Sequence, residues 1–131
     1  IFIMVICFSA CSPAPDLSFT EKITVQYTTH NENIKFEITD SKDIQEIIAA
    51  CTENARSRDG DCGFDVVQLT FEGGNKQVKL LPAGDNCDVI KYGDLNYDKY
   101  YLIGEESKIK LISILHKYGL SFEYLSTEII K

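Results

Sequence analysis

Ile23-Thr24-Val25-Gln26-Tyr27-Thr28 is the stretch that decides the fold of this chain. Its apolar residues alternate with polar ones, which is the pattern of a β-strand with one buried face. The same alternation returns in Ile34-Lys35-Phe36-Glu37-Ile38-Thr39, after the polar turn His30-Asn31-Glu32-Asn33. Two such runs joined by a short polar turn predict a β-hairpin.

A helix is predicted directly after this hairpin, over roughly residues 42–56. Asp40 or Ser41 offers a side-chain oxygen for the N-cap, and Asp43 near the start suits the helix dipole. An apolar stripe at helical spacing follows, formed by Ile44, Ile47, Ile48 and Cys51. We therefore expect the helix to pack on the sheet, with Cys51 as a small buried core residue.

The second half of the chain predicts four further strands and a second helix. The expected strands cover residues 64–72, 76–81, 87–92 and about 100–103. Gly73-Gly74-Asn75 supplies a tight turn, and Pro82 ends the strand before it. The helix begins at Glu105-Glu106 and is followed by Gly119, a good C-capping residue. Its inward-facing residues are expected to be Ile109, Leu111, Ile112 and Leu115.

The element order ββα-ββββα predicts an α+β fold. Hairpin connections favour a mainly antiparallel sheet of about six strands, with the two helices packed on one face. Residues 19–131 have the length of a single globular domain. The formal net charge of −7 argues against nucleic acid and against a flat position on an anionic lipid surface, because both select basic patches.

The first dozen residues carry the clearest functional signal. The uncharged apolar run Ile1-Phe2-Ile3-Met4-Val5-Ile6-Cys7 leads into Phe8-Ser9-Ala10-Cys11. This last motif resembles the lipobox of bacterial lipoproteins, in which small residues precede a cysteine that receives a lipid. The resemblance implies that residues 1–10 are a signal peptide, incomplete at its N-terminus, and that Cys11 carries the lipid.

Such a lipid would hold the protein firmly to a bilayer, since two or more acyl chains give stable anchoring. Residues 11–18 would then be the lipidated cysteine and a flexible, proline-containing tether. The resemblance implies an exported protein of the bacterial cell envelope. Ser12 after the cysteine resembles the signal for the outer membrane or cell surface.

Three cysteines remain in the mature chain, in a compartment that permits disulfides. Cys62 and Cys87 lie in polar turns before two predicted strands, and we predict that they pair. The alternative is a bond between Cys51 and Cys62. The histidines, His30 and His116, lack the Cys-x-x-Cys or His-x-x-x-His spacing of a zinc site.

Two acidic turns would meet if Cys62 and Cys87 pair. Asp59, Asp61, Asp85 and Asp88 would then form a weak calcium candidate, because calcium prefers oxygen ligands. The same carboxylates could serve a small enzyme. Turns use Asp, Asn and Gly in any case, and the spacing differs from that of a calcium-binding loop, so no metal or cofactor is assigned.

A Tyr-rich stretch between two predicted strands is the candidate binding loop, formed by Tyr92, Tyr97, Tyr100 and Tyr101. Tyrosine rings among Asp, Asn and Gly are typical of contact loops, although strand alternation would turn either Tyr100 or Tyr101 into the core. With no catalytic signature in the chain, we expect a lipid-anchored binding module that contacts a protein or envelope component. The alternative is a lipoprotein that binds a small ligand or cation, or a carboxylate-dependent enzyme.

Overall fold

The computed structural model describes residues 14–28, 33–58, 67–84, 87–94 and 97–120. These residues form an α+β fold, as predicted, with seven strands rather than about six. The elements in chain order are β1 (Lys22–Thr28), β2 (Asn33–Ile38), α1 (Ser41–Thr52), β3 (Arg56–Arg58), β4 (Val67–Gly73), β5 (Lys76–Pro82), β6 (Val89–Asp94), β7 (Tyr97–Leu102) and α2 (Glu105–Lys117).

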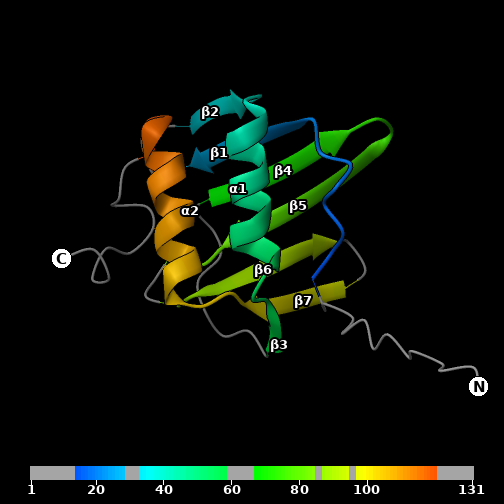
Figure 1. Cartoon of the computed structure of the whole chain (residues 1–131), viewed down its shortest axis with the longest axis vertical. Coiled ribbons are helices and arrows are strands. Elements are labelled where there is room, and N and C mark those ends of the chain that lie inside the picture. The colour runs from blue at the N-terminus through cyan, green and yellow to red at the C-terminus, as the bar shows by residue number, and fades with distance from the viewer. Residues whose placement is uncertain (1–13, 29–32, 59–66, 85–86, 95–96, 121–131) are drawn as a thin grey trace, which may run out of the picture.

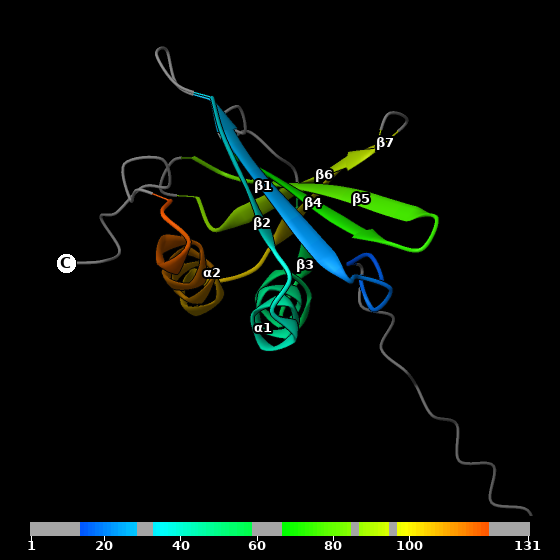
Figure 2. The ribbon, with the colours of Figure 1, turned by 90° about the horizontal axis from the view of Figure 1, so that it is seen from above.

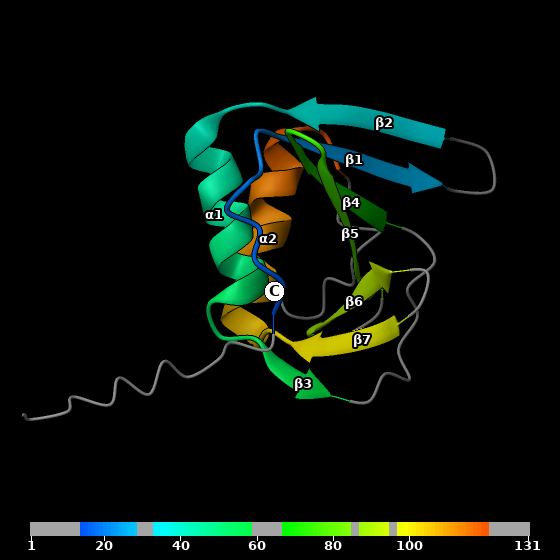
Figure 3. The ribbon, with the colours of Figure 1, turned by 90° about the vertical axis from the view of Figure 1, so that its right-hand side faces the viewer.

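All described strands belong to one sheet, in the order β2-β1-β4-β5-β6-β7-β3. Every pairing is antiparallel. Figure 3 shows the sheet curving from β1 and β2 at one end to β7 and β3 at the other. Both helices cover the same face of it, as the sequence predicted (Figure 2). Within the described residues, neither helix combines the length and apolarity that crossing a membrane requires.

The strand registers align the apolar residues on that helix-facing side. Val25 of β1 lies opposite Phe36 of β2 and Leu69 of β4. Ile23 in the same way lies between Ile38 and Phe71. These pairings build one continuous core, because a strand presents every second side chain to the same face.

Helix α1 begins as expected and ends earlier than expected. The Asp40 carboxylate accepts a hydrogen bond from the Asp43 N–H at 2.9 Å, which identifies Asp40 as the N-cap. Arg56, the expected end of the helix, instead begins β3, the edge strand beside β7. The edge of β7 offers unpaired backbone groups that β3 satisfies. Hydrophobic periodicity carries no information on such a long-range pairing.

Helix α2 buries Leu111, Ile112 and Leu115, as predicted, whereas Ile109 is only half-buried. The buried face of α2 includes Lys108 in place of Ile109, and Ile114 is buried as well. Gly119 has φ 102°, the left-handed conformation expected of a C-capping glycine. Leu120 follows it into the core with 2% of its surface exposed.

The segment Ala14–Glu21, which we call the arm, is packed rather than flexible. Leu17 retains 1% exposure and belongs to the main core. The Glu21 N–H donates to the Glu72 carbonyl at 2.8 Å. Figures 1 and 2 show the arm beside α1, on the side away from α2. The prediction of a flexible tether up to residue 18 is therefore wrong from Ala14 onward.

A polar junction links the start of α1 to the end of α2. The Lys117 ammonium lies 2.8 Å from the Asp43 carboxylate, and the Tyr118 hydroxyl donates to the same carboxylate. The Tyr118 ring stacks on Phe36 of β2 with ring centroids 6.0 Å apart. The hydrogen bonds from Lys117 and Tyr118 lower the pKa of Asp43, and the bond to Asp43 raises the pKa of Tyr118 to about 12.

We predict that Asp43→Asn lowers the melting temperature at neutral pH, because it removes the carboxylate that Lys117 and Tyr118 bind. The pKa of Asp43 is lower in the folded state, so this stabilisation is present above the unfolded value of about 3.9. It is lost as the pH falls through the folded value, and the difference in melting temperature should shrink below about pH 4. Thermal denaturation followed by circular dichroism across this range measures the effect. A difference that stays constant would contradict the assigned ion pair.

Candidate functional site

An open groove runs along α1, between the helix and the arm. It consists of two hollows that share Ser18 and Ile48. The hollow near the start of α1 has a volume of about 610 Å³ and is lined by Ser18, Thr20, Glu21, Ser41, Ile44, Gln45, Ile48 and Ala49. The hollow near the end of α1 has a volume of about 490 Å³ and is lined by Ala14, Pro15, Asp16, Leu17, Ser18, Ile48, Thr52 and Glu53.

Helix α1 has one face in the core and an adjacent face that lines the groove. Ile47 and Cys51 point into the core with 0% and 2% exposure. Gln45 and Ile48 lie on the adjacent face and line the groove. The apolar stripe predicted from the sequence therefore divides, because Ile48 is only half-buried and forms the groove wall.

The arm forms the opposite wall and is held in place by its own hydrogen bonds. The Asp16 carboxylate accepts from the Ser18 N–H at 2.9 Å, and the Thr20 hydroxyl donates to the Leu17 carbonyl at 2.7 Å. Behind the arm, the Lys76 ammonium lies 5.8 Å from the centre of the Phe19 ring. Together with the buried Leu17, these contacts give the groove a fixed wall.

The rim of the groove carries negative charge. Among the described residues that line it, Asp16, Glu21 and Glu53 are acidic and none is basic. The hydrogen bonds from Ser18, helped by the nearby Lys76, lower the pKa of Asp16, so this carboxyl is ionised at neutral pH. The groove therefore combines an apolar wall with an acidic rim. Sequence analysis missed it because the arm was predicted to be a tether.

The tyrosines of the predicted binding loop belong to β6 and β7, which pair as a β-hairpin, so the structure places them on strands. Tyr101 is 4% exposed and lies in the core, and this burial raises its pKa. Tyr92 is half-buried against the same core, whereas Tyr100 packs against a second, smaller cluster formed by Ala83 and Val89. Tyr97 pairs with Asp94 through the backbone. Of the described side chains, Tyr92 and Tyr101 therefore belong to the main core and Tyr100 to the smaller cluster, whereas the use of this hairpin for binding stays a prediction.

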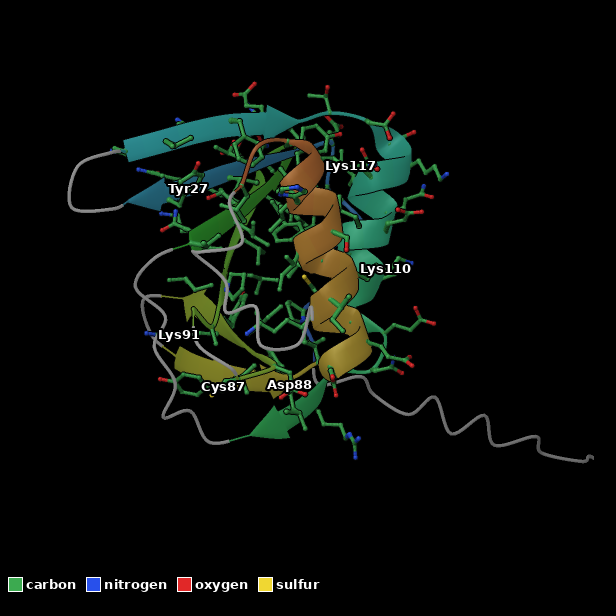
Figure 4. The ribbon with its side chains drawn as sticks, turned by 90° about the vertical axis from the view of Figure 1, so that its left-hand side faces the viewer. Tyr27, Cys87, Asp88, Lys91, Lys110 and Lys117 are labelled. Carbon is green, nitrogen blue, oxygen red and sulfur yellow. The ribbon has the colours of Figure 1, made fainter. Side chains whose placement is uncertain are left out.

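Of the candidate calcium residues, Asp88 alone is described, and Asp59, Asp61 and Asp85 lie outside the described residues. The Asp88 carbonyl accepts from the Ile103 N–H at 2.8 Å. Figure 4 shows Asp88 and Cys87 near the first turn of α2. Nowhere in the described ranges do three or more potential metal-ligating side chains gather.

A buried lysine, Lys108 of α2, stabilises this part of the fold. Its side chain is 2% exposed, and its ammonium donates to the carbonyls of Ala83, at 3.2 Å, and Cys87. The buried ammonium of Lys108 thus connects α2 to the described ends of the turn between β5 and β6. The sequence contains the signal for this residue, since Lys108 precedes Leu111, Ile112 and Leu115 at helical spacing.

The cysteines are only partly described. Cys51 is free and 2% exposed, which confirms it as a core residue and rules out its bond to Cys62. Burial raises the pKa of its thiol to about 12, so it is a poor nucleophile. Cys87 is disulfide-bonded. Cys62 and Cys11 lie outside the described residues, so the Cys62–Cys87 pairing stays a prediction.

Of the two histidines, His116 is the one that lies in the described part of the chain. His116 is exposed near the end of α2, and its Nδ1 lies 3.1 Å from the Leu120 carbonyl. His30 lies outside the described residues.

A further hollow, separate from the groove, opens where β5 and β6 separate, and we call it the sheet hollow. The pairing of these strands ends at Leu80 and Tyr92. The hollow has a volume of about 470 Å³ and is lined by Gln68, Gln77, Val78, Lys79, Leu81, Tyr92 and Gly93. Its lining mixes amides, a lysine and apolar side chains, without the one-sided charge of the groove.

Comparisons of this chain with protein-family models, with curated proteins and with solved structures found no match. The function is therefore inferred from the residues of the chain itself.

We predict that Lys108→Met destabilises the protein by about 2–4 kcal/mol, because it leaves two carbonyls without their charged donor. Methionine keeps most of the buried volume, so the loss reports the hydrogen bonds. The matched control is Lys110→Met, at an exposed position of the same helix (Figure 4), with an expected change within about 0.5 kcal/mol. Urea denaturation measures both. Equal effects of the two substitutions would contradict the role given to Lys108.

We also predict that Cys51 resists alkylation in the native protein and reacts rapidly once the protein is unfolded. The reason is its burial and its raised thiol pKa. Iodoacetamide labelling followed by peptide mass spectrometry, with and without denaturant, tests this. Rapid labelling of Cys51 under native conditions would contradict the packing of α1 on the sheet.

Proposed function

We propose that this protein is an exported bacterial lipoprotein, anchored by a lipid on Cys11, whose domain is a binding module for a protein of the cell envelope. The groove along α1 is the observation that carries the proposal. The lipobox-like motif Phe8-Ser9-Ala10-Cys11 supports the anchor and the location at the outer membrane or cell surface.

The chemistry of the groove suits contact with a polypeptide. Its floor and walls expose Ile48, Ala49 and the apolar part of the arm, next to the polar side chains of Ser41 and Gln45. Ligand and partner sites are typically concave, mostly apolar and edged by a few polar groups. The net charge of −7 argues against nucleic acid as the partner, because nucleic acid selects basic surfaces.

A disulfide between Cys62 and Cys87 is part of the proposal. Cys87 is disulfide-bonded and Cys51 is free, and Cys62 is the remaining cysteine of the mature chain once the signal peptide is removed and Cys11 carries lipid. Such a bond fits an exported protein, because disulfides persist in oxidising compartments.

The alternative function, a cation-binding or carboxylate-dependent enzyme lipoprotein, depends on Asp59, Asp61, Asp85 and Asp88. Of these, Asp88 alone lies in the part of the chain that the structure describes, and Lys108 already places a positive charge on the neighbouring carbonyls. No observation favours this alternative over the binding module.

The proposal predicts that one envelope protein co-purifies with the tagged full-length protein after cross-linking of whole cells. Cys11→Ser, which cannot be lipidated, should lose this partner and leave the membrane fraction. Ile48→Lys should stay in the membrane fraction and lose the partner, because a lysine in the groove blocks apolar docking.

The matched control is Val78→Lys, which places the same charge on a half-buried apolar position in the sheet hollow. It should retain the partner. Loss of the partner from Val78→Lys but not from Ile48→Lys would contradict the groove as the binding surface. A Cys11→Ser protein that remains firmly in the membrane fraction would contradict the lipid anchor.

A further inference from the structure

We propose that the groove receives a basic amphipathic helix belonging to a membrane-associated protein, close to the surface of the bilayer. The proposal rests on the function proposed above and specifies the chemistry of the partner. Three features of the described residues lead to it, namely the shape of the groove, its backbone and its charge, together with the short distance in sequence from the groove to Cys11.

The shape of the groove matches a short helix. Helix α1 has 12 residues, which corresponds to a length of about 18 Å at 1.5 Å per residue. The two hollows follow this length and share Ser18 and Ile48, so a partner can lie along both. A helix of about three turns spans the same distance and can present an apolar stripe to Ile48 and Ala49.

The backbone around the groove favours a helix over an extended strand. On the arm, the N–H groups of Ser18, Thr20 and Glu21 are already bonded, to Asp16, Leu17 and Glu72 respectively. On the other side, α1 presents side chains. A strand binds by pairing its backbone with a sheet edge, whereas a helix satisfies its own backbone and docks through side chains. The groove therefore suits the second mode.

The charge of the groove selects a basic partner. Asp16, Glu21 and Glu53 stand at its rim, and none of the described lining residues is basic. Opposite charges across an interface steer association and exclude partners of the wrong sign. The same carboxylates disfavour the bilayer itself as the occupant, because an anionic lipid surface attracts basic segments and repels acidic ones.

The position of the groove places its occupant next to the membrane. Ala14 and Pro15 line one end of the groove. Three residue steps separate Ala14 from Cys11, and a fully extended chain covers at most about 11 Å in that distance. With Cys11 lipidated, this end of the groove stays close to the bilayer surface. A partner that reaches it must have its own basic helix near the same surface.

The test measures binding of a model peptide to the full-length lipidated protein in nanodiscs of uncharged phosphatidylcholine, with empty nanodiscs as the blank. The probe is a fluorescent leucine–lysine peptide of about 18 residues, with leucine at amphipathic helical spacing. A leucine–glutamate peptide with the same spacing is the control for charge. Fluorescence anisotropy gives the dissociation constant of each.

Two protein variants with the same change in net charge separate groove binding from general attraction to an acidic protein. The groove-charge variant carries Asp16→Asn, Glu21→Gln and Glu53→Gln. The remote-charge variant neutralises three exposed carboxylates elsewhere, with Glu37→Gln, Glu105→Gln and Glu106→Gln. Melting temperatures of both verify that the fold is retained.

We expect the leucine–lysine peptide to bind at least about tenfold more tightly than the leucine–glutamate peptide. The groove-charge variant should raise its dissociation constant about tenfold, as the loss of three surface ion pairs implies, and the remote-charge variant less than about twofold. Added salt should weaken binding to the unmodified protein. Equal binding to the two charge variants, or no binding of the leucine–lysine peptide, would overturn the inference.

The outcome is separable from that of the cell experiment above. If Ile48→Lys abolishes capture of the cellular partner while the leucine–lysine peptide fails to bind, the groove is a binding site of different specificity and only the basic helix is refuted. If neither the partner nor the peptide depends on the groove, both proposals fail.

Discussion

Leu17 buries its side chain in the main core, and the fixed position of the arm beside α1 depends on this contact. The curved sheet has one apolar face, which α1 and α2 cover over most of its area (Figures 2 and 3). The arm closes the side of the core that lies away from α2. Since Leu17 is 1% exposed, the chain on either side of it is held against α1. The groove exists because the arm has a fixed position there.

The same contact links the fold to the proposed anchor. A flexible tether up to residue 18 would let the domain move well away from the membrane. A packed arm leaves only Ser12 and Pro13 between Cys11, the proposed lipidation site, and the described domain. If Cys11 carries a lipid, as proposed, the end of the groove at Ala14 and Pro15 lies within three residues of the anchor. The proposed partner at the membrane surface depends on this short connection together with the acidic rim of the groove.

The sequence predicted those parts of the fold that local chemistry determines. The alternation around Val25 and Phe36 specified the first hairpin, Asp40 the start of α1, and Gly119 the end of α2. Features that depend on distant pairing were missed. Strand β3 exists because the edge of β7 lies beside it, and Tyr101 of the predicted loop lies in the core because of its place on β7.

The groove could not be predicted for the same reason. Pro13, Pro15 and Ser18 have the composition of a tether, and nothing local shows that Leu17 finds a place in a core built by residues much later in the chain. Ile48 gave a partial signal, as an apolar residue at the margin of the stripe on α1. For Lys108 the signal was clearer, because this residue lies at helical spacing from the buried Leu111 and Leu115. Its charge, in contrast, is typical of a solvent-exposed position.

Amide hydrogen exchange across the arm of the full-length protein tests the central claim most directly, because the groove and the short connection to the membrane both require a packed arm. The account predicts that the Glu21 amide, bonded to Glu72 at 2.8 Å, exchanges as slowly as the amides of β1, and that the Thr20 amide, bonded to Leu17 at 3.1 Å, is also protected. Exchange of both amides at the rate of an unstructured peptide would show a mobile tether and contradict the account.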